Sequence, residues 1–289
     1  MHGLGNDFVV LEGRNAAFDV IPYAQVIADR RFGIGCDQLI IAREPSAAQP
    51  AYDARMEIVN ADGSIVEMCG NGIRCFARWL HDHVGLHRDT YQIETLAGRI
   101  RPTLQTDGQI RVAMGPATTA ADQLPAAASH FAPGTDLTRA EIEAAGRSWQ
   151  FCGVQVGNPH FVTIVDDVDA IDLASIGPHI ENHPAFPRRI NVEFVQLTAE
   201  GARVRVWERG SGITLACGTG ATAVGAALFR LGHRRDRARI DLPGGSLLIE
   251  EIQGEMYMTG PATEVYSGTL TESDLKSALA ALRASQAAS

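Results

Sequence analysis

Short apolar runs rich in β-branched side chains dominate the pattern of this chain, and such runs predict strands. Turn signals at QTDGQ (105–109) and LPGGS (242–246) predict hairpins, because glycine supplies the positive φ that tight turns need. The chain is therefore predicted to be strand-rich, with antiparallel or mixed sheets. The predicted strands are FVVLEG (8–13), QLIIAR (38–43), RMEIVN (55–60), YQIETL (91–96), IRVAMG (110–115), VQVGNPHFVTIV (154–165), NVEFVQL (191–197), ARVRVWE (202–208) and SLLIEE (246–251).

A few segments change to the period of a helix. Apolar residues recur at helical spacing over 73–84 and again over 221–231, and each run stops at a glycine, Gly85 or Gly232. RAEIEAAG (139–146) predicts a third helix. It follows the Ala/Pro-rich stretch 117–134, which we interpret as a connection between two halves of the chain.

The two main helices begin at near copies of one motif. EMCGNGIRCFARWL (67–80) aligns with LACGTGATAVGAAL (215–228), which pairs Cys69 with Cys217 just before the first helical turn. A second echo joins GNDFVV (5–10) to GNPHFV (157–162). Duplicated halves that face each other across a cleft would bring the two cysteines together.

The paired motif suggests proton transfer. We expect a helix start to lower the pKa of its thiol toward neutrality and to offer N–H donors to a carboxylate. Two thiols on opposite sides of a bound carboxylate could take a proton from one face of a carbon and return one to the other, with the helix ends stabilising the developing charge. The usual electron sink would be pyridoxal phosphate, but no convincing lysine-based site is apparent, so we expect no cofactor.

Length and composition limit the alternatives. At 289 residues the chain is long enough for two domains, and its 45% apolar content is that of a globular protein. A net charge of −9 argues against nucleic-acid and anionic-membrane partners. No stretch reaches the roughly 20 apolar residues of a spanning helix. The start, MHGLGNDF, lacks a secretory pattern, so a cytoplasmic location is expected.

The remaining cysteines are interpreted as structural. Five cysteines at irregular spacing do not form a disulfide framework, and reduced thiols are expected. Cys36, Cys75 and Cys152 fit small buried hydrophobes. Zinc is disfavoured and no metal is expected, because Cys69 and Cys75 are not spaced as a Cys-x-x-Cys pair.

Further polar residues could hold a substrate. Glu208 and Arg209, in WERGSG, precede the second motif, where the arginine could clamp a carboxylate and the glutamate could receive an ammonium. Four asparagines end strands next to turns: Asn6, Asn60, Asn158 and Asn191. A rival interpretation treats GTGATA, with Asp241 downstream, as a dinucleotide fingerprint. It leaves the first copy of the motif unexplained, and the hairpins argue against a parallel nucleotide-binding sheet.

Taken together, these motifs resemble the diaminopimelate epimerase family. The resemblance implies an α/β (α+β) fold of two similar domains, with mixed or antiparallel sheets each wrapped on a central helix and an active site in the cleft between them. The expected domains are 1–117, with the tail 263–289 returning to it, and 118–262. The stretches that carry the resemblance are HGLGNDFV (2–9), RRFGIGCDQ (30–38), NADGSIVEMCGNGIRC (60–75), VGNPHFV (156–162), RINVEF (189–194) and WERGSGITLACGTGA (207–221).

The resemblance also implies an activity and a set of residues. The activity is interconversion of LL- and meso-2,6-diaminopimelate, on the route to lysine and peptidoglycan cross-links, by a homodimer. Cys69 and Cys217 would be the paired acid and base, His160 would help to set their protonation states, and Glu208 would lie near the reacting ammonium. Residues implied to bind the substrate are Asn6, Gln38, Asn60, Gly70, Asn71, Asn158, Asn191, Glu208, Arg209, Gly218 and Thr219.

Two alternatives stay open at this point. Proline racemases and hydroxyproline epimerases are similar, but they typically have a histidine where this chain has Asn71, and they lack ERG. A redox or binding module with a regulatory Cys69–Cys217 disulfide is the alternative from another class. The chain also departs from the family pattern in two places. The family usually carries a few residues before HGLGND, which would shorten the first strand here, and Cys36 stands where a small apolar residue is common.

Overall fold

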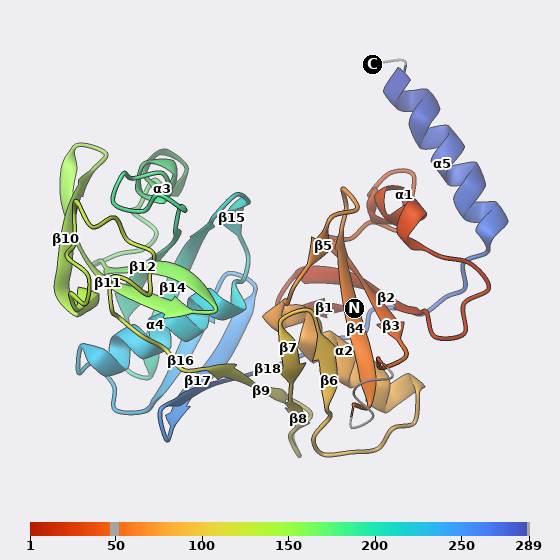
Figure 1. Ribbon diagram of the computed structural model, residues 1–289, viewed down its shortest axis with the longest axis horizontal. Helices are drawn as coiled ribbons and strands as arrows, with labels where there is room; N and C mark the ends of the chain where they lie inside the picture. The colour runs from red at the N-terminus through yellow and green to blue at the C-terminus, as the bar shows by residue number, and fades with distance from the viewer. Residues whose placement is uncertain (47–51, 288–289) are drawn as a thin grey trace. The chain divides into compact units, whose positions relative to one another are not determined.

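The computed structural model describes residues 1–46 and 52–287 and divides into two compact units (Figure 1). One unit contains residues 1–112 and the chain from Pro261 onward; the other contains residues 113–260. The boundaries therefore lie at 112/113 and 260/261, where the sequence suggested 117/118 and 262/263. Of the tail expected to return to the first domain, residues 288 and 289 lie outside the described residues.

The first unit has a mixed sheet with the strand order β1-β2-β3-β4-β6-β7, and β5 pairs with β4. The pairs β2–β3 and β4–β6 are parallel, while the others are antiparallel. A hairpin joins β8 to β9 across the predicted turn, and the boundary at 112/113 falls within β9. The strands are β1 (His2–Gly3), β2 (Asn6–Glu12), β3 (Gln38–Arg43), β4 (Ala54–Asn60), β5 (Ile65–Val66), β6 (Ile93–Thr95), β7 (Gly98–Ile100), β8 (Pro102–Leu104) and β9 (Ile110–Gly115).

Helix α2 (Gly70–His83) is the central helix of this unit and contacts β1, β2 and β8. Its apolar face, with Ile73, Phe76 and Leu80, is fully buried, as the helical spacing predicted. The chain leaves the helix through Gly85 at φ +70°. A second cluster packs η1 (Ile21–Tyr23) and α1 (Ala24–Ala28) against the tail helix α5 (Glu272–Ala287).

The second unit has a longer mixed sheet with the order β10-β11-β12-β13-β14-β16-β17-β18, and β15 pairs with β14. The pairs β12–β13 and β14–β16 are parallel. The strands are β10 (Ala140–Ala144), β11 (Arg147–Val156), β12 (Asn158–Ile164), β13 (Asn191–Leu197), β14 (Gly201–Glu208), β15 (Gly212–Thr214), β16 (Arg237–Leu242), β17 (Gly245–Ile252) and β18 (Glu255–Gly260).

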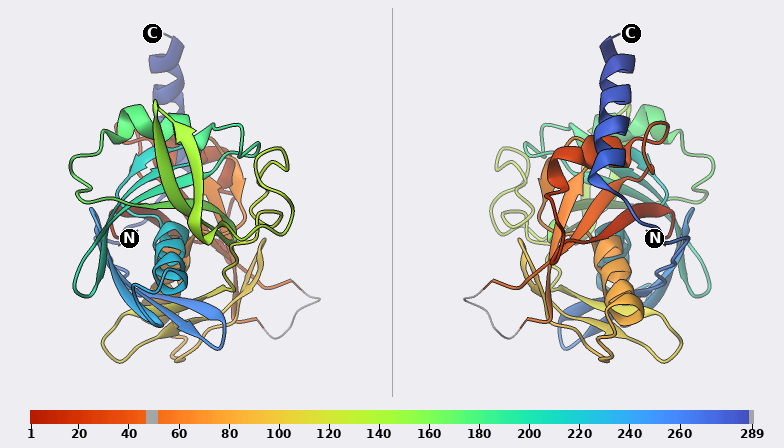
Figure 2. Two further views of the ribbon diagram at one scale, coloured as in Figure 1. Left: turned by 90° about the vertical axis from the view of Figure 1, so that its left-hand side faces the viewer. Right: turned by 90° about the vertical axis from the view of Figure 1, so that its right-hand side faces the viewer.

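Helix α4 (Gly218–Arg230) lies within this curved sheet and contacts every strand from β11 to β18 except β15. Figure 2 views each unit from its own side, with α4 among its strands in the left panel and α2 in the right. Close packing explains the small residues of α4: a Cβ on Gly225 would lie only 2.4 Å from Ile249 Cγ2. Helix α3 (Leu173–Glu181) packs on β13 and β14. The predicted class, mixed sheets around a central helix in each unit, is confirmed.

The two units repeat one arrangement of elements. In the first, β2 runs parallel to β3 with Phe8 opposite Gln38, and in the second β12 runs parallel to β13 with His160 opposite Asn191. The GNDF and GNPHF echo aligns Phe8 with His160, and two residues further along the next strand Ile40 aligns with Glu193. Each pair of strands is followed by the helix that begins with Cys-Gly-x-Gly.

The helix predicted over 139–146 is wrong. After a short 3₁₀ turn, Ala140–Ala144 forms β10, which pairs antiparallel with β11. Ile142 and Ala144 are buried while the glutamates between them are exposed, so the segment follows the period of a strand. A two-residue turn at Ala145 and Gly146, both at positive φ, closes the hairpin. Pairing and burial outweigh the helix propensity of Ala and Glu.

The Ala/Pro-rich stretch 117–134 is not a connection between the units. It lies inside the second unit, where Ala121 and Leu124 are buried in the core and Thr118 bridges to Gln155. By contrast, both predicted hairpin turns are confirmed between β8 and β9 and between β16 and β17. Across the described residues, no helix is long and apolar enough to cross a membrane.

Candidate active site

The first helix start is built around Cys69, which is the N-cap of α2. Its backbone is extended (φ −136°, ψ 119°), and its sulfur accepts a hydrogen bond from the Gly72 N–H at 3.4 Å. The first-turn amides at Gly70 and Asn71 project from the helix N-terminus, where an anion is favoured. Gly70 and Asn71 are themselves buried, whereas Cys69 is half-buried.

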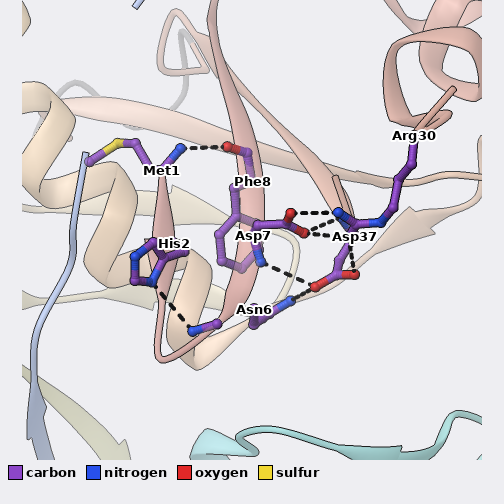
Figure 3. A network of polar contacts seen from close by, with 8 residues as sticks. Met1, His2, Asn6, Asp7, Phe8, Arg30 and Asp37 are labelled. Carbon is purple, nitrogen blue, oxygen red and sulfur yellow. Dashed lines mark hydrogen bonds and ion pairs between the residues drawn. The ribbon is translucent and has the colours of Figure 1, made fainter. Parts of the chain in front are cut away.

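Asn6 is held in one orientation beside this cysteine. Its amide nitrogen donates to Asp37 Oδ2 at 2.8 Å, so its oxygen faces the Cys69 sulfur at 3.7 Å and accepts from Asn71 Nδ2 at 3.3 Å. Arg30 bridges Asp7 and Asp37 in turn, with contacts of 2.7 and 3.0 Å (Figure 3). A carboxylate pair clamped by one guanidinium therefore fixes the orientation of the amide that accepts from the thiol.

Arg74 lies one helical turn beyond Cys69 and is fully buried. It donates to Gly70 O, to Asn71 Oδ1 and to the carbonyl of Pro261, at 3.1, 2.8 and 3.2 Å. Burial lowers the pKa of Arg74 to about 10, against the favourable effect of negative charge at Cys75 and Cys69. Arg74, absent from the residues predicted from the sequence, places a positive charge beside the Cys69 thiol. An arginine placed directly between the apolar residues Ile73 and Cys75 was the available signal.

The other predicted residues of this unit form a separate pair. Gln38, at the start of β3, donates from Nε2 to Asn60 Oδ1 at 2.9 Å, and Asn60 donates to the Ser64 hydroxyl at 2.9 Å. Gln38 follows Asp37 directly in the chain, which places the pair next to the clamp that holds Asn6.

The second helix start repeats the first. Cys217 is the N-cap of α4 with an extended backbone (φ −119°, ψ 116°), and its sulfur accepts from the Gly220 N–H at 3.3 Å. The Thr219 hydroxyl lies 3.4 Å from the same sulfur. The expectation that each cysteine stands at the start of a helix is therefore confirmed. In both helices the cysteine sulfur also accepts a capping hydrogen bond.

The expected lowering of the thiol pKa is wrong for Cys217. Burial raises the pKa of this thiol well above its ordinary value, and the carboxylates of Glu208 and Glu193 raise it further. The hydrogen bonds from Thr219 and the Gly220 amide oppose that shift without cancelling it. Removal from water and two nearby negative charges outweigh the favourable end of the helix dipole.

Glu208 ends β14 in the same environment. Its Oε1 accepts from the Thr214 hydroxyl at 2.6 Å. Burial raises the pKa of Glu208 and the charge of Glu193 adds to this, whereas hydrogen bonds from Thr214 and Cys217 and the charge of His160 lower it. The carboxyl group and the thiol are thus hydrogen-bonded neighbours: the thiol lowers the pKa of Glu208, whereas the charge of Glu208 raises the pKa of Cys217.

His160 connects two strands. Its Nδ1 lies 2.7 Å from Glu193 Oε1 and its Nε2 lies 2.7 Å from Asn158 Oδ1. The side chains of His160 and Glu193 are both completely buried. Glu193 is absent from the residues predicted from the sequence, although a glutamate between Val192 and Phe194 in a buried strand was a usable signal.

Asn191 and Arg209 support the loop after β14. Asn191 donates to the Pro159 carbonyl and accepts from the Arg209 amide, both at 2.9 Å. The Arg209 guanidinium donates to the Arg188 carbonyl at 3.1 Å. Hydrogen bonds therefore hold the predicted site residues of the second unit at strand ends or at the start of α4. In the first unit, hydrogen bonds hold the predicted site residues at the start of α2 or on β3 and β4.

The remaining cysteines and the lysine lie apart from these clusters. Burial raises the pKa of Cys36 to about 11 and those of Cys75 and Cys152 to about 12, as expected for buried structural thiols. All five cysteines are free thiols. The sequence has one lysine, Lys276, and its exposed side chain pairs with Glu272 on α5. Among the described residues, no group of side chains is arranged to hold a metal.

The structure around GTGATA and Asp241 does not support the dinucleotide-binding interpretation. Asp241 lies on β16, where it accepts from Arg239 at 2.8 Å and from the Ser246 hydroxyl at 2.5 Å. The strand before GTGATA is β15, which runs antiparallel to β14. Helix α4 does connect the parallel strands β14 and β16, but β15 stands between β14 and GTGATA, so the direct turn from a parallel strand into the helix that such a motif requires is absent there.

The fold is shared with solved structures of other proteins. It matches a phenazine biosynthesis protein of the PhzF family from Enterococcus faecalis, with a TM-score of 0.66 and 13% identity over 92% of this chain and 93% of that one. It also matches a hydroxyproline epimerase from Agrobacterium vitis, with a TM-score of 0.62 and 15% identity over 91% of this chain and 87% of that one. At these identities the likeness concerns the fold alone.

Sequence similarity identifies the family. The model of the diaminopimelate epimerase family matches residues 1–120 and 152–265. Diaminopimelate epimerases of Synechocystis sp. and Nostoc punctiforme are each 46% identical, over 92% and 93% of this chain and 96% and 97% of their own length. The chain belongs to the diaminopimelate epimerase family and is thus an isomerase.

Proposed function

We propose that this protein interconverts LL- and meso-2,6-diaminopimelate by two-base proton transfer between Cys69 and Cys217, in lysine and peptidoglycan precursor biosynthesis. The observation that carries the proposal is the matched pair of helix caps. Each cysteine is the N-cap of the helix that follows Cys-Gly-x-Gly, with its sulfur against the N–H three residues on. The mechanism requires the two units to present these sulfurs to opposite faces of one Cα.

In the proposed step, a thiolate takes the Cα proton and a thiol gives its proton to the opposite face. The C–H bond that breaks is replaced by the one that forms, and the two sulfurs exchange protonation states. The buried, carboxylate-flanked Cys217 starts as the donor, which makes Cys69, beside the buried cation of Arg74, the first acceptor. The opposite direction of reaction reverses these roles.

The substrate carboxylate next to the reacting carbon would be held by the first-turn amides of the two helices, which also stabilise the charge that develops during proton removal. Glu208 would lie near the reacting ammonium, and His160 would help to set the protonation states of the thiols. The rest of the substrate would be bound by Asn6, Gln38, Asn60, Asn71, Asn158, Asn191 and Arg209.

No pyridoxal phosphate is invoked. A Schiff base to that cofactor needs a lysine, and Lys276 is on an exposed face of α5, paired with Glu272 at 3.0 Å. The proposal extends to a cytoplasmic homodimer, whose mass in solution can be measured by sedimentation equilibrium.

The deciding experiment is incubation with LL-diaminopimelate in deuterium oxide without added cofactor. Deuterium at Cα and formation of the meso isomer are expected. Cys69→Ala and Cys217→Ala should each reduce epimerisation by about 10²–10⁴-fold. Full turnover in either variant would refute the two-base mechanism. Turnover of proline but not diaminopimelate would indicate a proline-type racemase, and activity that rises on oxidation would indicate a regulatory disulfide.

A further inference from the structure

The buried pair His160 and Glu193 is the point at which the second unit departs from the first. At the equivalent positions of the first unit, Phe8 and Ile40 are buried and apolar, and both pack on Gly72 of α2. The repeat therefore shows that this fold can fill these two positions without polar atoms.

Glu193 lies directly against the first turn of α4. A Cβ on Gly220 would meet Glu193 Oε1 at 2.7 Å, whereas the nearest atom to a Cβ on Gly72 would be Ile40 Cδ1, at 3.2 Å. The same point on Gly220 lies 3.3 Å from the Cys217 sulfur. The carboxylate and the sulfur are consequently within about 6 Å of each other, close enough for a charge to change a thiol's ionisation.

The hydrogen bonding of Glu193 is incomplete. Its Oε1 faces His160 Nδ1 at 2.7 Å, but its buried Oε2 has no hydrogen-bond partner among the described residues. Leaving a buried charged oxygen unpaired costs free energy, and apolar residues of similar volume are often neutral or better for stability. Stability alone therefore does not explain why a glutamate stands here.

We propose that Glu193 is a positioning residue, which fixes the His160 ring and places a negative charge at the first turn of α4 beside Cys217. An ionised carboxylate only accepts, so Nδ1 of His160 donates to it, while Nε2 faces Asn158 Oδ1 at 2.7 Å. Only the expected changes in epimerisation kinetics rest on the proposed function. The hydrogen bond and the charge can be tested without substrate.

The direction of the effect follows from the charged groups around Glu193. His160 faces it from β12, Glu208 lies at the end of the neighbouring β14, and Cys217 begins α4. The charge of Glu193 raises the pKa of Cys217, so Glu193→Gln should lower it. The thiol would then be lost at lower pH, and the alkaline limb of kcat/KM, which requires the thiol as donor, should move to lower pH by about one unit or more.

The experiment compares Glu193→Gln with Glu181→Gln. Glu181 is also a buried carboxylate of the second unit, but it binds the Trp207 indole and the Gly210 amide. Alkylation of Cys217 by iodoacetamide, followed by peptide mass spectrometry across pH, is measured without substrate. We expect its midpoint to fall in Glu193→Gln and to stay in Glu181→Gln. An unchanged midpoint in Glu193→Gln would overturn the proposal.

Two further measurements separate positioning from folding. In ¹⁵N spectra of the imidazoles, assigned with His160→Phe, the Nδ1 resonance of His160 should change in Glu193→Gln. The double variant His160→Phe/Glu193→Ile, copied from the first unit, should keep its free energy of unfolding while epimerisation falls. A large loss of stability there would make the pair structural and overturn the inference. If the wild-type protein fails to epimerise diaminopimelate, the proposed function fails, while alkylation and spectra still decide the role of Glu193.

Discussion

The two helix starts share a backbone and differ in charge. In the Cys69 cluster (Cys69, Asn6, Asn71 and Arg74), the sulfur contacts the Asn6 amide, which Asn71 holds in turn, and the nearby charge is the buried guanidinium of Arg74. In the Cys217 cluster (Cys217, Glu208, His160 and Glu193), the nearby charges are the carboxylates of Glu208 and Glu193, and the His160 imidazole binds Glu193. A positive neighbour favours a thiolate and negative neighbours favour a thiol.

The difference teaches how a duplicated unit can supply both an acid and a base. The N-cap geometry is copied in both units, because it depends on the local Cys-Gly-x-Gly sequence. The charge is set elsewhere, by residues of β12, β13 and β14 in one unit and by Arg74 of α2 itself in the other. Changes that exchange these surroundings therefore test the comparison directly, and four of them follow in order of expected effect.

Placing the charge of one cluster in the other should have the largest effect on stability. Ile40→Glu puts a carboxylate at the position equivalent to Glu193, but its counterpart there is Phe8 and not a histidine. The fully buried, unpaired carboxylate should reduce the free energy of unfolding by about 3–5 kcal/mol, measured by urea denaturation. Phe8→His in the same chain should recover part of that loss. No loss in the single variant would mean that the position is less buried than described.

Removal of the buried cation should come next. Arg74→Met leaves the acceptors on Gly70, Asn71 and Pro261 without this donor but also removes a buried charge, so the net loss of unfolding free energy should be about 1–3 kcal/mol. Alkylation of Cys69 at neutral pH should also slow, because a thiolate loses its nearby cation. Arg78→Met, one turn further along the same helix and only half-buried, is the control and should change stability by less than about 0.5 kcal/mol. Equal effects in both variants would contradict the contrast.

Alanine at the two capping glycines should distinguish the clusters more gently. Gly220→Ala drives a methyl group against Glu193 Oε1 at 2.7 Å and should cost about 1–3 kcal/mol. Gly72→Ala meets Ile40 Cδ1 at 3.2 Å, the mobile end of a side chain, and should cost less than about 1 kcal/mol. Thermal unfolding measures both. Adding Glu193→Ala should relieve only the Gly220→Ala variant; relief of neither would disprove the proposed contact.

The smallest effect is expected at the exposed clamp. Asp37→Asn removes the charge that pairs with Arg30 and frees the orientation of the Asn6 amide. Because the pair is exposed, the free energy of unfolding should fall by no more than about 1 kcal/mol. The effect should appear instead as a modest loss of kcat/KM, since the Asn6 oxygen would no longer be fixed toward Cys69. A change in stability without any kinetic change would show that the clamp does not orient Asn6.

Local patterns predicted much of this fold. The strand runs 38–43, 110–115 and 191–197 match β3, β9 and β13 residue for residue, and both cysteines were placed at helix starts. The prediction of a helix over 139–146 was wrong. The composition there favours a helix, but pairing with β11 and burial of Ile142 impose a strand. Propensity is a local quantity, whereas strand pairing depends on a partner elsewhere in the chain.

The features of the candidate site also fall into those that local sequence predicts and those that depend on tertiary structure. The sequence by itself determined the paired cysteines, the glycines after them and the asparagines at strand ends, because capping and turn chemistry act over a few residues. Only the tertiary structure decided that Arg74, on the helix that Cys69 begins, is fully buried, that Glu193 lies near Cys217, and that Cys217 is held as a thiol despite the favourable end of its own helix dipole. Burial and charge are summed over strands and helices far apart in the chain, so the neighbours that set them are fixed by folding.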